Sequence, residues 1–349
     1  MRERLAIFIG RHGTALEAGL NEWLPVSRQP QAGQLNEALR YAVFPGGKRW
    51  RPFLTLIGAG LAGGCPKKAL PAACAVEFLH TSSIILDDLP AMDDAGLRRG
   101  RAALHLVFGE SVALLAALAL LNESYSLLAR SAGAGGAATL LNEATQCVGA
   151  DGMIGGQVVD LALRGEANGA EALASRKLKT TALMRLTMTA GARACGAAED
   201  EAAALASFGE CLGTAYQICD DLLDELAESE SVGKTVRQDA RHRCPTFVAE
   251  FGVDGAHRLA ASLVEDGIAA VADKFGRRHE VELLDDAAGL ILRRARRLRR
   301  ATRDEPLPLD DPGPFPPRGH ALDGAQLAES RAHESILPRK SLGPDPGAE

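Results

Sequence analysis

Two clusters of aspartates stand out as residues whose type and spacing could do chemistry. The first lies in the segment HTSSIILDDLPAMDDAGLRR, residues 80–99, where four carboxylates fall within eight positions: Asp87, Asp88, Asp93 and Asp94. So much like charge is costly unless cations neutralise it, and Arg98 and Arg99 follow at once. Oxygen ligands without nearby His or Cys pairs favour a hard cation such as Mg²⁺, which usually bridges to substrate phosphates.

The apolar run before this cluster, residues 72–86, is predicted to form a helix. Polar groups recur along it at three- and four-residue spacing, so His80, Ser83 and Asp87 share one face. Asp87 therefore stands at the top of a helical wall, with Ser83 about one turn (~5.4 Å) below it.

Pro90 follows the wall closely and is expected to end the helix. The resulting turn would let Asp93 or Asp94 fold back toward Asp87, although their spacing does not place them on one helical face. Taken alone, the segment fits a solvated acidic turn that caps a helix equally well.

A second acidic segment favours the metal site over that alternative. The sequence QICDDLLDE, residues 217–225, places Asp220 and Asp224 four residues apart on one helical face, with Asp221 adjacent. By itself it fits an ordinary amphipathic surface helix. Two facing carboxylate sets, however, could hold metal ions between them, and a metal cluster of this kind typically binds a diphosphate.

The composition of the 349-residue chain favours an all-α fold. Hydrophobic residues make up 46% and are dominated by Ala and Leu, whereas aromatic residues make up 4%, and strand-forming runs are few. The length suits one large domain or two small ones. A net charge of −6 argues against a general nucleic-acid partner.

Cysteine usage and hydropathy indicate a soluble, cytoplasmic protein. The seven cysteines are scattered without CxxC spacing, as expected of buried thiols in a reducing compartment. The N-terminal segment MRERLAIFIGRHG is too short and too charged for a signal peptide. The longest apolar run, residues 112–121, is far below membrane-spanning length, so we expect no transmembrane segment.

Basic and polar segments separate the predicted helices, which include residues 104–129, 139–164, 176–194 and 208–226. The loop PGGKRWRP, residues 45–52, carries three cations on one turn but lacks the glycine spacing of a Walker A motif. Residues 132–138 and 165–175 are expected to be loops, and residues 228–244 either a lid over bound diphosphate or a solvated loop. We predict one helical domain over residues 1–300 and a disordered Pro/Gly-rich tail over residues 301–349.

With these segments assembled, residues 30–295 resemble the trans-isoprenyl diphosphate synthases. The resemblance is carried by GGKRWRP, EFLHTSSIILDDLPAMDDAGLRRG, HLVFGE, GGQVVDL, the Lys179–Thr180 pair, YQICDDLLDE and GKTVRQD. The two aspartate motifs at this separation are specific, and the other segments are weak alone. Within the family the chain is most similar to bacterial carotenoid-pathway geranylgeranyl diphosphate synthases, which share the two extra residues of the first motif and an apolar stretch like residues 116–121.

The resemblance implies a fold and a role for each site residue. The implied fold is an isoprenoid-synthase bundle of antiparallel helices around a deep central cavity, usually as a homodimer. The implied catalytic residues are Asp87, Asp88, Asp93, Lys179, Asp220 and Asp221. The implied ligands of Mg²⁺ are Asp87, Asp88, Asp93, Asp220, Asp221 and Asp224. The allylic diphosphate would be held by Arg98, Lys179, Thr180, Gln217 and Lys234, and isopentenyl diphosphate by Lys48, Arg51, His80 and Arg99.

The implied reaction condenses isopentenyl diphosphate with a dimethylallyl, geranyl or farnesyl diphosphate. Metal ions and cationic side chains stabilise the charge that develops on the departing diphosphate. The isopentenyl double bond then attacks the allylic cation, and a proton is lost to the departing diphosphate. An apolar, closed cavity keeps water from quenching the cation.

Ser82 and Ser83 bear on the length of the product. Relatives that stop at fifteen carbons commonly carry an aromatic plug at this depth, so two serines leave room for a further isoprene unit and predict geranylgeranyl diphosphate (C20). Three alternatives stay open: a farnesyl diphosphate synthase (C15), a weakly active or non-catalytic partner subunit of a prenyl synthase, and a class I terpene cyclase. Because a cyclase binds no isopentenyl diphosphate, the basic residues predicted to hold that substrate argue against the third.

Overall fold

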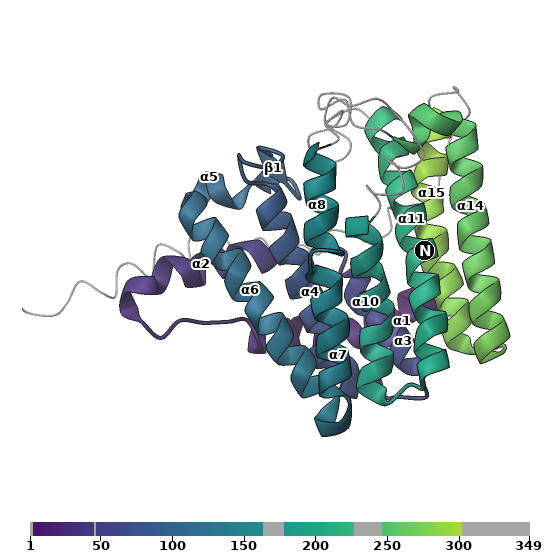
Figure 1. The fold of residues 1–349 in the computed structure, drawn as a ribbon, viewed down its shortest axis with the longest axis horizontal. Coiled ribbons are helices and arrows are strands. Elements are labelled where there is room, and N and C mark those ends of the chain that lie inside the picture. The colour runs from purple at the N-terminus through teal and green to yellow at the C-terminus, as the bar shows by residue number, and fades with distance from the viewer. Residues whose placement is uncertain (1–2, 45–46, 163–177, 227–245, 302–349) are drawn as a thin grey trace, which may run out of the picture. The chain divides into compact units, whose positions relative to one another are not determined.

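Strong helix formers dominate the sequence, and the computed structural model accordingly consists of helices joined by short turns (Figure 1). It describes residues 3–44, 47–162, 178–226 and 246–301. The predicted all-α class is confirmed. Within these residues the sheet structure is one antiparallel hairpin of β1 (Leu97–Arg98) and β2 (Arg101–Ala102). Residues 302–349 of the predicted tail lie outside the described residues.

In chain order the helices are α1 (Glu3–Glu22), η1 (Pro30–Ala32), α2 (Gly33–Val43), α3 (Trp50–Leu61), α4 (Pro66–Asp87), α5 (Leu104–Phe108), α6 (Glu110–Ser131), α7 (Gly133–Val148), α8 (Met153–Ala162), α10 (Leu178–Cys195), α11 (Glu199–Leu226), α14 (Phe247–Phe275) and α15 (His279–Ala301).

Local signals set several of these boundaries. Pro66 opens α4 at a position where its missing N–H costs nothing. Thr246 caps α14, because its Oγ1 accepts the amide of Ala249 at 3.0 Å. α4 ends at Asp87, before the turn that contains Pro90, as the sequence predicted.

Three predicted boundaries were wrong, and glycine lies at each of them. Residues 104–129 form two helices rather than one, because Gly109 takes a φ of 81° between α5 and α6. Residues 132–138 were expected to be a loop, yet α7 begins at Gly133, where tertiary packing overrides low helix propensity. Residues 139–164 are interrupted by a turn at residues 149–152 that separates α7 from α8.

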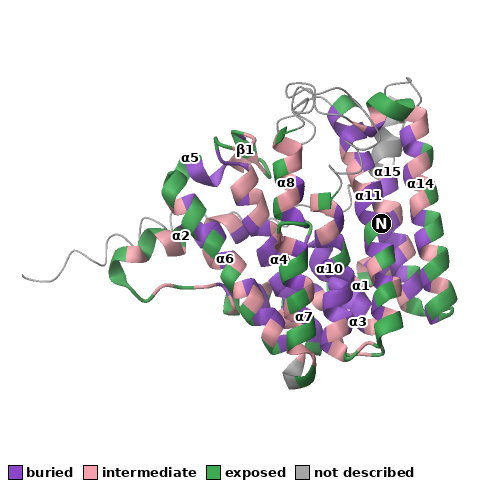
Figure 2. Ribbon diagram, viewed as in Figure 1, coloured by how far each residue is buried: buried purple, intermediate pink, exposed green. Residues whose placement is uncertain are grey.

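α4 lies in the centre of the bundle, where it packs against α3, α6 and α10 (Figure 1). Every residue from Ala72 to Leu79 is exposed by 2% or less, so this helix is buried on all sides. Figure 2 shows the same division throughout the fold, with buried positions where helices face one another and exposed positions outside. α11, α14 and α15 pack together as a further group of helices.

Two helices, α4 and α6, are long and apolar enough to cross a membrane when judged by length and composition alone. The longest uninterrupted apolar run had predicted no such segment. In α4, 67% of the apolar window is buried within the protein, as in the core helix of a bundle. In α6 that share is 39%, which leaves part of an apolar helix uncovered.

Candidate active site

The turn after α4 folds back over the end of the helix. The amide of Asp93 donates to the carbonyl of Asp87 at 2.9 Å, and the amide of Ala95 donates to the carbonyl of Asp88 at 3.2 Å. The fold-back predicted from Pro90 is confirmed. It brings the charge of Asp93 close enough to Asp87 to add to the effect of burial, which raises the pKa of the Asp87 carboxyl.

Asp87 faces Lys179 of α10. The Lys179 ammonium pairs with Asp87 Oδ1 and donates to Gln157 Oε1 of α8 at 2.7 Å. α8 and α10 approach closely here, because a Cβ on Gly156 would lie 2.7 Å from the Lys179 backbone nitrogen. The ion pair opposes the effect of burial on the pKa of Asp87. Two of the predicted catalytic residues therefore meet across α4 and α10.

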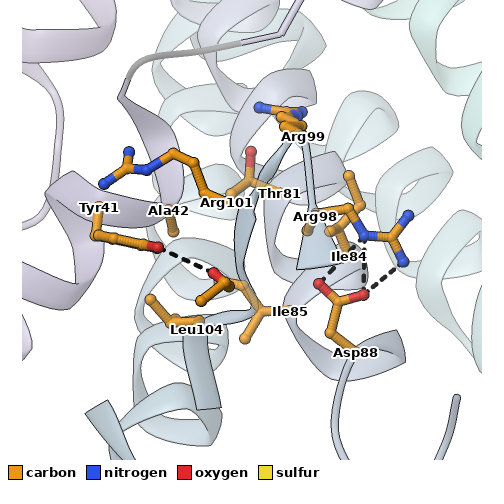
Figure 3. Close-up of a pocket in the computed structure, with 11 residues that line it drawn as sticks. Tyr41, Ala42, Thr81, Ile84, Ile85, Asp88, Arg98, Arg99, Arg101 and Leu104 are labelled. Atoms are coloured by element: carbon orange, nitrogen blue, oxygen red, sulfur yellow. Dashed lines mark hydrogen bonds and ion pairs between the residues drawn. The ribbon is translucent and has the colours of Figure 1, made fainter. Parts of the chain in front are cut away.

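Asp88, by contrast, is bound by Arg98 of the hairpin. Arg98 Nε lies 2.9 and 3.2 Å from the two carboxylate oxygens, and both groups border a cavity of about 50 Å³ between α2, α4 and the hairpin (Figure 3). The Asp88 carboxyl is buried, which raises its pKa, while the hydrogen bond from Arg98 lowers it. The geometry makes Asp88 the partner of Arg98, and its predicted role as a metal ligand stays a prediction.

A group of cations surrounds His80, about two turns below Asp87 on α4. Its Nε2 lies 3.1 Å from Arg51 Nη1. Burial, followed by the charges of Arg51, Arg99, Arg98 and Lys179, holds the pKa of His80 well below its usual value. The ring is therefore neutral at neutral pH, and because Nε2 accepts from Arg51, Nδ1 carries the proton and is able to donate.

Arg51 connects this group to the second aspartate motif. Its guanidinium lies 5.7 Å from the centre of the Tyr216 ring on α11. Burial lowers the pKa of Arg51, and the nearby Tyr216, Glu77 and Asp220 oppose that effect. Residues of both motifs, which are far apart in sequence, therefore interact with the guanidinium of Arg51.

A chain of hydrogen bonds anchors the second motif. Thr180 Oγ1 donates to Gln217 Oε1 at 3.2 Å, and Gln217 Nε2 donates to Asp221 Oδ1 at 2.9 Å. The other oxygen of Asp221 accepts the amide of Phe247, at the start of α14, at 2.9 Å. Asp221 and Asp224 are buried, and Asp220 is half-buried. The predicted residues Thr180, Gln217 and Asp221 therefore form one connected unit.

The remaining predicted residues occupy different settings. Lys48 is exposed, and Lys234 lies outside the described residues, as does the charged segment 228–244. Ser83 is half-buried and donates to the carbonyl of His80 in its own helix at 2.9 Å. Ser82 is buried and donates to the carbonyl of Ala117 in α6 at 2.9 Å.

The donor chemistry of this region fits Mg²⁺. In the part of the chain that the structure describes, no group of three or more His, Cys, Asp or Glu side chains is arranged to hold a metal ion. The candidate donors are nevertheless carboxylate oxygens, which Mg²⁺ prefers. Burial and the charge of Asp93 raise the pKa of Asp87, so a cation placed between these carboxylates would relieve an unfavourable ionisation.

Glu77 and Arg49 were missed as site residues in the sequence. Glu77 is buried in α4, and its Oε1 lies 2.8 Å from Arg49 Nη1 and 3.8 Å from Arg99 Nη2. A signal was present, because Glu77 is the acidic residue within the apolar run AACAVEFLH. A carboxylate in a buried helix requires a cationic partner, and the basic loop at residues 45–52 supplies one.

Known proteins resemble this chain in sequence and in fold. The family model described as polyprenyl synthetase matches residues 32–274. Geranylgeranyl pyrophosphate synthase 6, mitochondrial, from Arabidopsis thaliana is 40% identical over 242 residues, which cover 66% of this chain and 71% of that protein. A solved FPP/GFPP synthase from Zymomonas mobilis has a TM-score of 0.72 at 30% identity and covers 84% of this chain and 100% of that one. A geranyltransferase from Helicobacter pylori, solved with magnesium and isoprenyl diphosphate, has a TM-score of 0.70 at 28% identity and covers 84% and 97%.

Proposed function

Because the chain belongs to the polyprenyl synthetase family, we propose that it condenses isopentenyl diphosphate with an allylic diphosphate to make geranylgeranyl diphosphate. The observation that carries this proposal is the meeting of carboxylates and cations above α4. Asp87 with Lys179 and Asp88 with Arg98 lie at the end of one buried helix, and the neutral His80 beside Arg51 lies about two turns below them. Such a site suits two diphosphates bound side by side above an apolar bundle.

Each charged group has a distinct part in the proposed reaction. Lys179, fixed by Gln157, and Arg98, fixed by Asp88, bind the allylic diphosphate. Lys48, Arg51, Arg99 and the Nδ1–H of His80 bind isopentenyl diphosphate. The buried residues of α4 exclude water from the allylic cation. The proton released after carbon–carbon bond formation passes to the departing diphosphate.

Mg²⁺ is the proposed cofactor, in keeping with the magnesium named for the Helicobacter pylori geranyltransferase. The residues that would hold it are Asp87 and Asp93 on one side, and Asp220 and Asp224 on the other. Asp88 and Asp221 were also predicted as ligands, and their carboxylates already accept hydrogen bonds from Arg98, Gln217 and Phe247. When bound, the ion supplies positive charge that stabilises the departing diphosphate.

The length of the product is assigned from α4, the helix that carries Ser83 and Asp87. The similar proteins include enzymes named for C15, C20 and C25 products, so family membership alone does not set the chain length. Ser83 lies on the Asp87 face with a small side chain, which leaves space for a twenty-carbon product. The predicted likeness to carotenoid-pathway enzymes and the predicted cytoplasmic location stay predictions, and the Arabidopsis relative is named as mitochondrial.

The experiment incubates purified protein with Mg²⁺, labelled isopentenyl diphosphate and, separately, five-, ten- and fifteen-carbon allylic primers, then sizes the dephosphorylated products. A twenty-carbon alcohol that disappears in Asp87→Asn supports the proposal. A fifteen-carbon product keeps the reaction and overturns the assigned chain length. No incorporation from any primer overturns the proposal in favour of a partner subunit, or of a cyclase if an allylic diphosphate alone is consumed.

The exposed face of α6 is proposed to bind a second copy of the chain. Leu114, Leu115 and Leu118 form a stripe at three- and four-residue spacing and are exposed by 43–55%. Apolar stripes of this kind on a soluble fold mark contact surfaces. Light scattering after gel filtration should give a dimer for the wild type and for Val26→Glu, a control at another exposed apolar residue, and a monomer for Leu115→Glu. A monomeric wild type that floats with lipid vesicles would replace the second copy by a membrane surface.

A further inference from the structure

Glu77 places a negative charge inside an otherwise apolar stretch of the central helix. It lies three residues before His80 on α4 and is 2% exposed. Its Oε1 is 2.8 Å from Arg49 Nη1 and 3.8 Å from Arg99 Nη2. One buried carboxylate therefore faces two arginines from different segments of the chain, the basic loop before α3 and the hairpin after α4.

Arg49 turns inward from the basic loop and ties it to three helices. Besides Glu77, its guanidinium donates to Glu17 of α1 at 2.9 Å and to the carbonyl of Val43 in α2 at 2.9 Å. The residue takes a φ of 50°, which is rare without glycine. Because Arg49 is anchored in this way, the backbone that presents its neighbours Lys48 and Arg51 is fixed as well.

Arg99 is held between Glu77 and the same loop. A Cβ on Gly47 would lie 3.1 Å from Arg99 Cζ, so the guanidinium rests against the bare backbone of that glycine. Burial lowers the pKa of Arg99, and the neighbouring cations Arg49, Arg98 and Arg51 lower it further. Among the described groups that shift the pKa of Arg99, Glu77 is the one that favours its charged form.

We propose that Glu77 is a positioning residue for isopentenyl diphosphate: it holds Arg49 and Arg99 so that Lys48, Arg51 and Arg99 converge on one diphosphate. This inference rests on the proposed function. It predicts that removal of the Glu77 charge weakens the binding of isopentenyl diphosphate. Removing a negative charge from a cationic site would by itself strengthen the binding of an anion, whereas the loss of positioning weakens it.

Glu77→Gln tests the inference, because it keeps the shape and an acceptor oxygen but removes the charge. Glu17→Gln is the matched control, since Glu17 also binds Arg49 but is half-exposed and is not paired with Arg99. Steady-state kinetics would give KM for each substrate, and calorimetry would give Kd for isopentenyl diphosphate alone. We expect Glu77→Gln to raise both constants for isopentenyl diphosphate on the order of tenfold, the loss of one charge-assisted contact, with KM for the allylic substrate within about twofold. Glu17→Gln loosens Arg49 but keeps the Glu77–Arg99 pair, so its constants for isopentenyl diphosphate should rise by less than those of Glu77→Gln.

Gly47→Ala provides a second route if Glu77→Gln fails to fold. Gly47 is exposed, so the added methyl displaces Arg99 without disturbing the core, and the same selective loss is expected. An unchanged or lower KM for isopentenyl diphosphate in a folded Glu77→Gln, or in Gly47→Ala, overturns the inference while an active wild type keeps the proposed function. A wild type that neither turns over nor binds isopentenyl diphosphate overturns both.

Discussion

Replacement of Ser83 by phenylalanine should shorten the product from twenty carbons to fifteen. Ser83 lies four residues, or ~6 Å of helix rise, below Asp87 and shares its face of α4. Its hydroxyl donates to the carbonyl of His80 within the same helix. The substitution therefore removes a hydrogen bond inside α4 and not one between two helices. The phenyl ring would enter the path along which the chain grows away from the diphosphate.

The size of the effect follows from the cost of overfilling a packed site. Forcing extra atoms into a packed interior costs about 1–3 kcal/mol. Since 1.4 kcal/mol corresponds to tenfold, the chain that must pass the ring is disfavoured by roughly 5- to 150-fold. The ring lies a full turn from Asp87, so the addition that yields the fifteen-carbon product should keep most of its rate.

The assay compares the ratio of twenty- to fifteen-carbon alcohols from the ten-carbon primer under matched conversion. Ser82→Ala is the control, because Ser82 donates instead to Ala117 of α6 and lies on a different face of α4. Loss of that buried hydrogen bond should cost about 1 kcal/mol and lower Tm by a few degrees, with the product still at twenty carbons. A Ser83→Phe enzyme that still makes mainly the twenty-carbon product would refute the assignment of Ser83 to the wall of the product site.

Four further outcomes are expected. Asp88→Asn should raise KM for the allylic substrate by about tenfold, because Arg98 loses its charged partner; steady-state kinetics measure this. The pKa of His80 is lowered in the folded protein, so the unfolded chain binds more protons below about pH 6.5, stability falls with decreasing pH, and His80→Gln should reduce the loss of Tm between about pH 7 and 5. Burial raises the pKa of Cys147 to about 12, so iodoacetamide should alkylate the exposed Cys65 first in a mass-spectrometric time course and Cys147 after unfolding. Thr246→Ala should lower the free energy of unfolding in urea by about 1 kcal/mol, because α14 loses its N-cap.

The features predictable from sequence are those that depend on local chemistry. The helical wall follows from three- and four-residue spacing, and the return of Asp93 to Asp87 follows from Pro90, which ends the helix. The Gly-Gly pair in GGQVVDL likewise permits the close approach of α8 to α10, since a Cβ on Gly156 would lie 2.7 Å from the Lys179 backbone nitrogen. In each case a single residue type restricts the backbone strongly enough to be read without the rest of the fold.

The features that sequence analysis missed depend on which distant groups meet. The hairpin has strands of two residues, too short to give an alternating pattern. Ser82 donates to a carbonyl of α6, whereas Ser83 donates within α4, and this difference could not be predicted without the position of α6. The role of Glu77 required the loop before α3 and the hairpin after α4 to converge on one side of the helix.

Adjacent residues of the first motif, Asp87 and Asp88, face different sides of α4. Successive residues of a helix differ by about 100° in direction, so Asp87 meets Lys179 of α10 while Asp88 meets Arg98 of the hairpin. Three of the cations proposed to bind diphosphate thus have an acidic neighbour already: Lys179 has Asp87, Arg98 has Asp88, and Arg99 has Glu77. If a diphosphate took Lys179 from Asp87, as proposed, that carboxylate would become available to a metal ion. The anion and the cation would then enter together, and the buried site would hold neither charge unpaired.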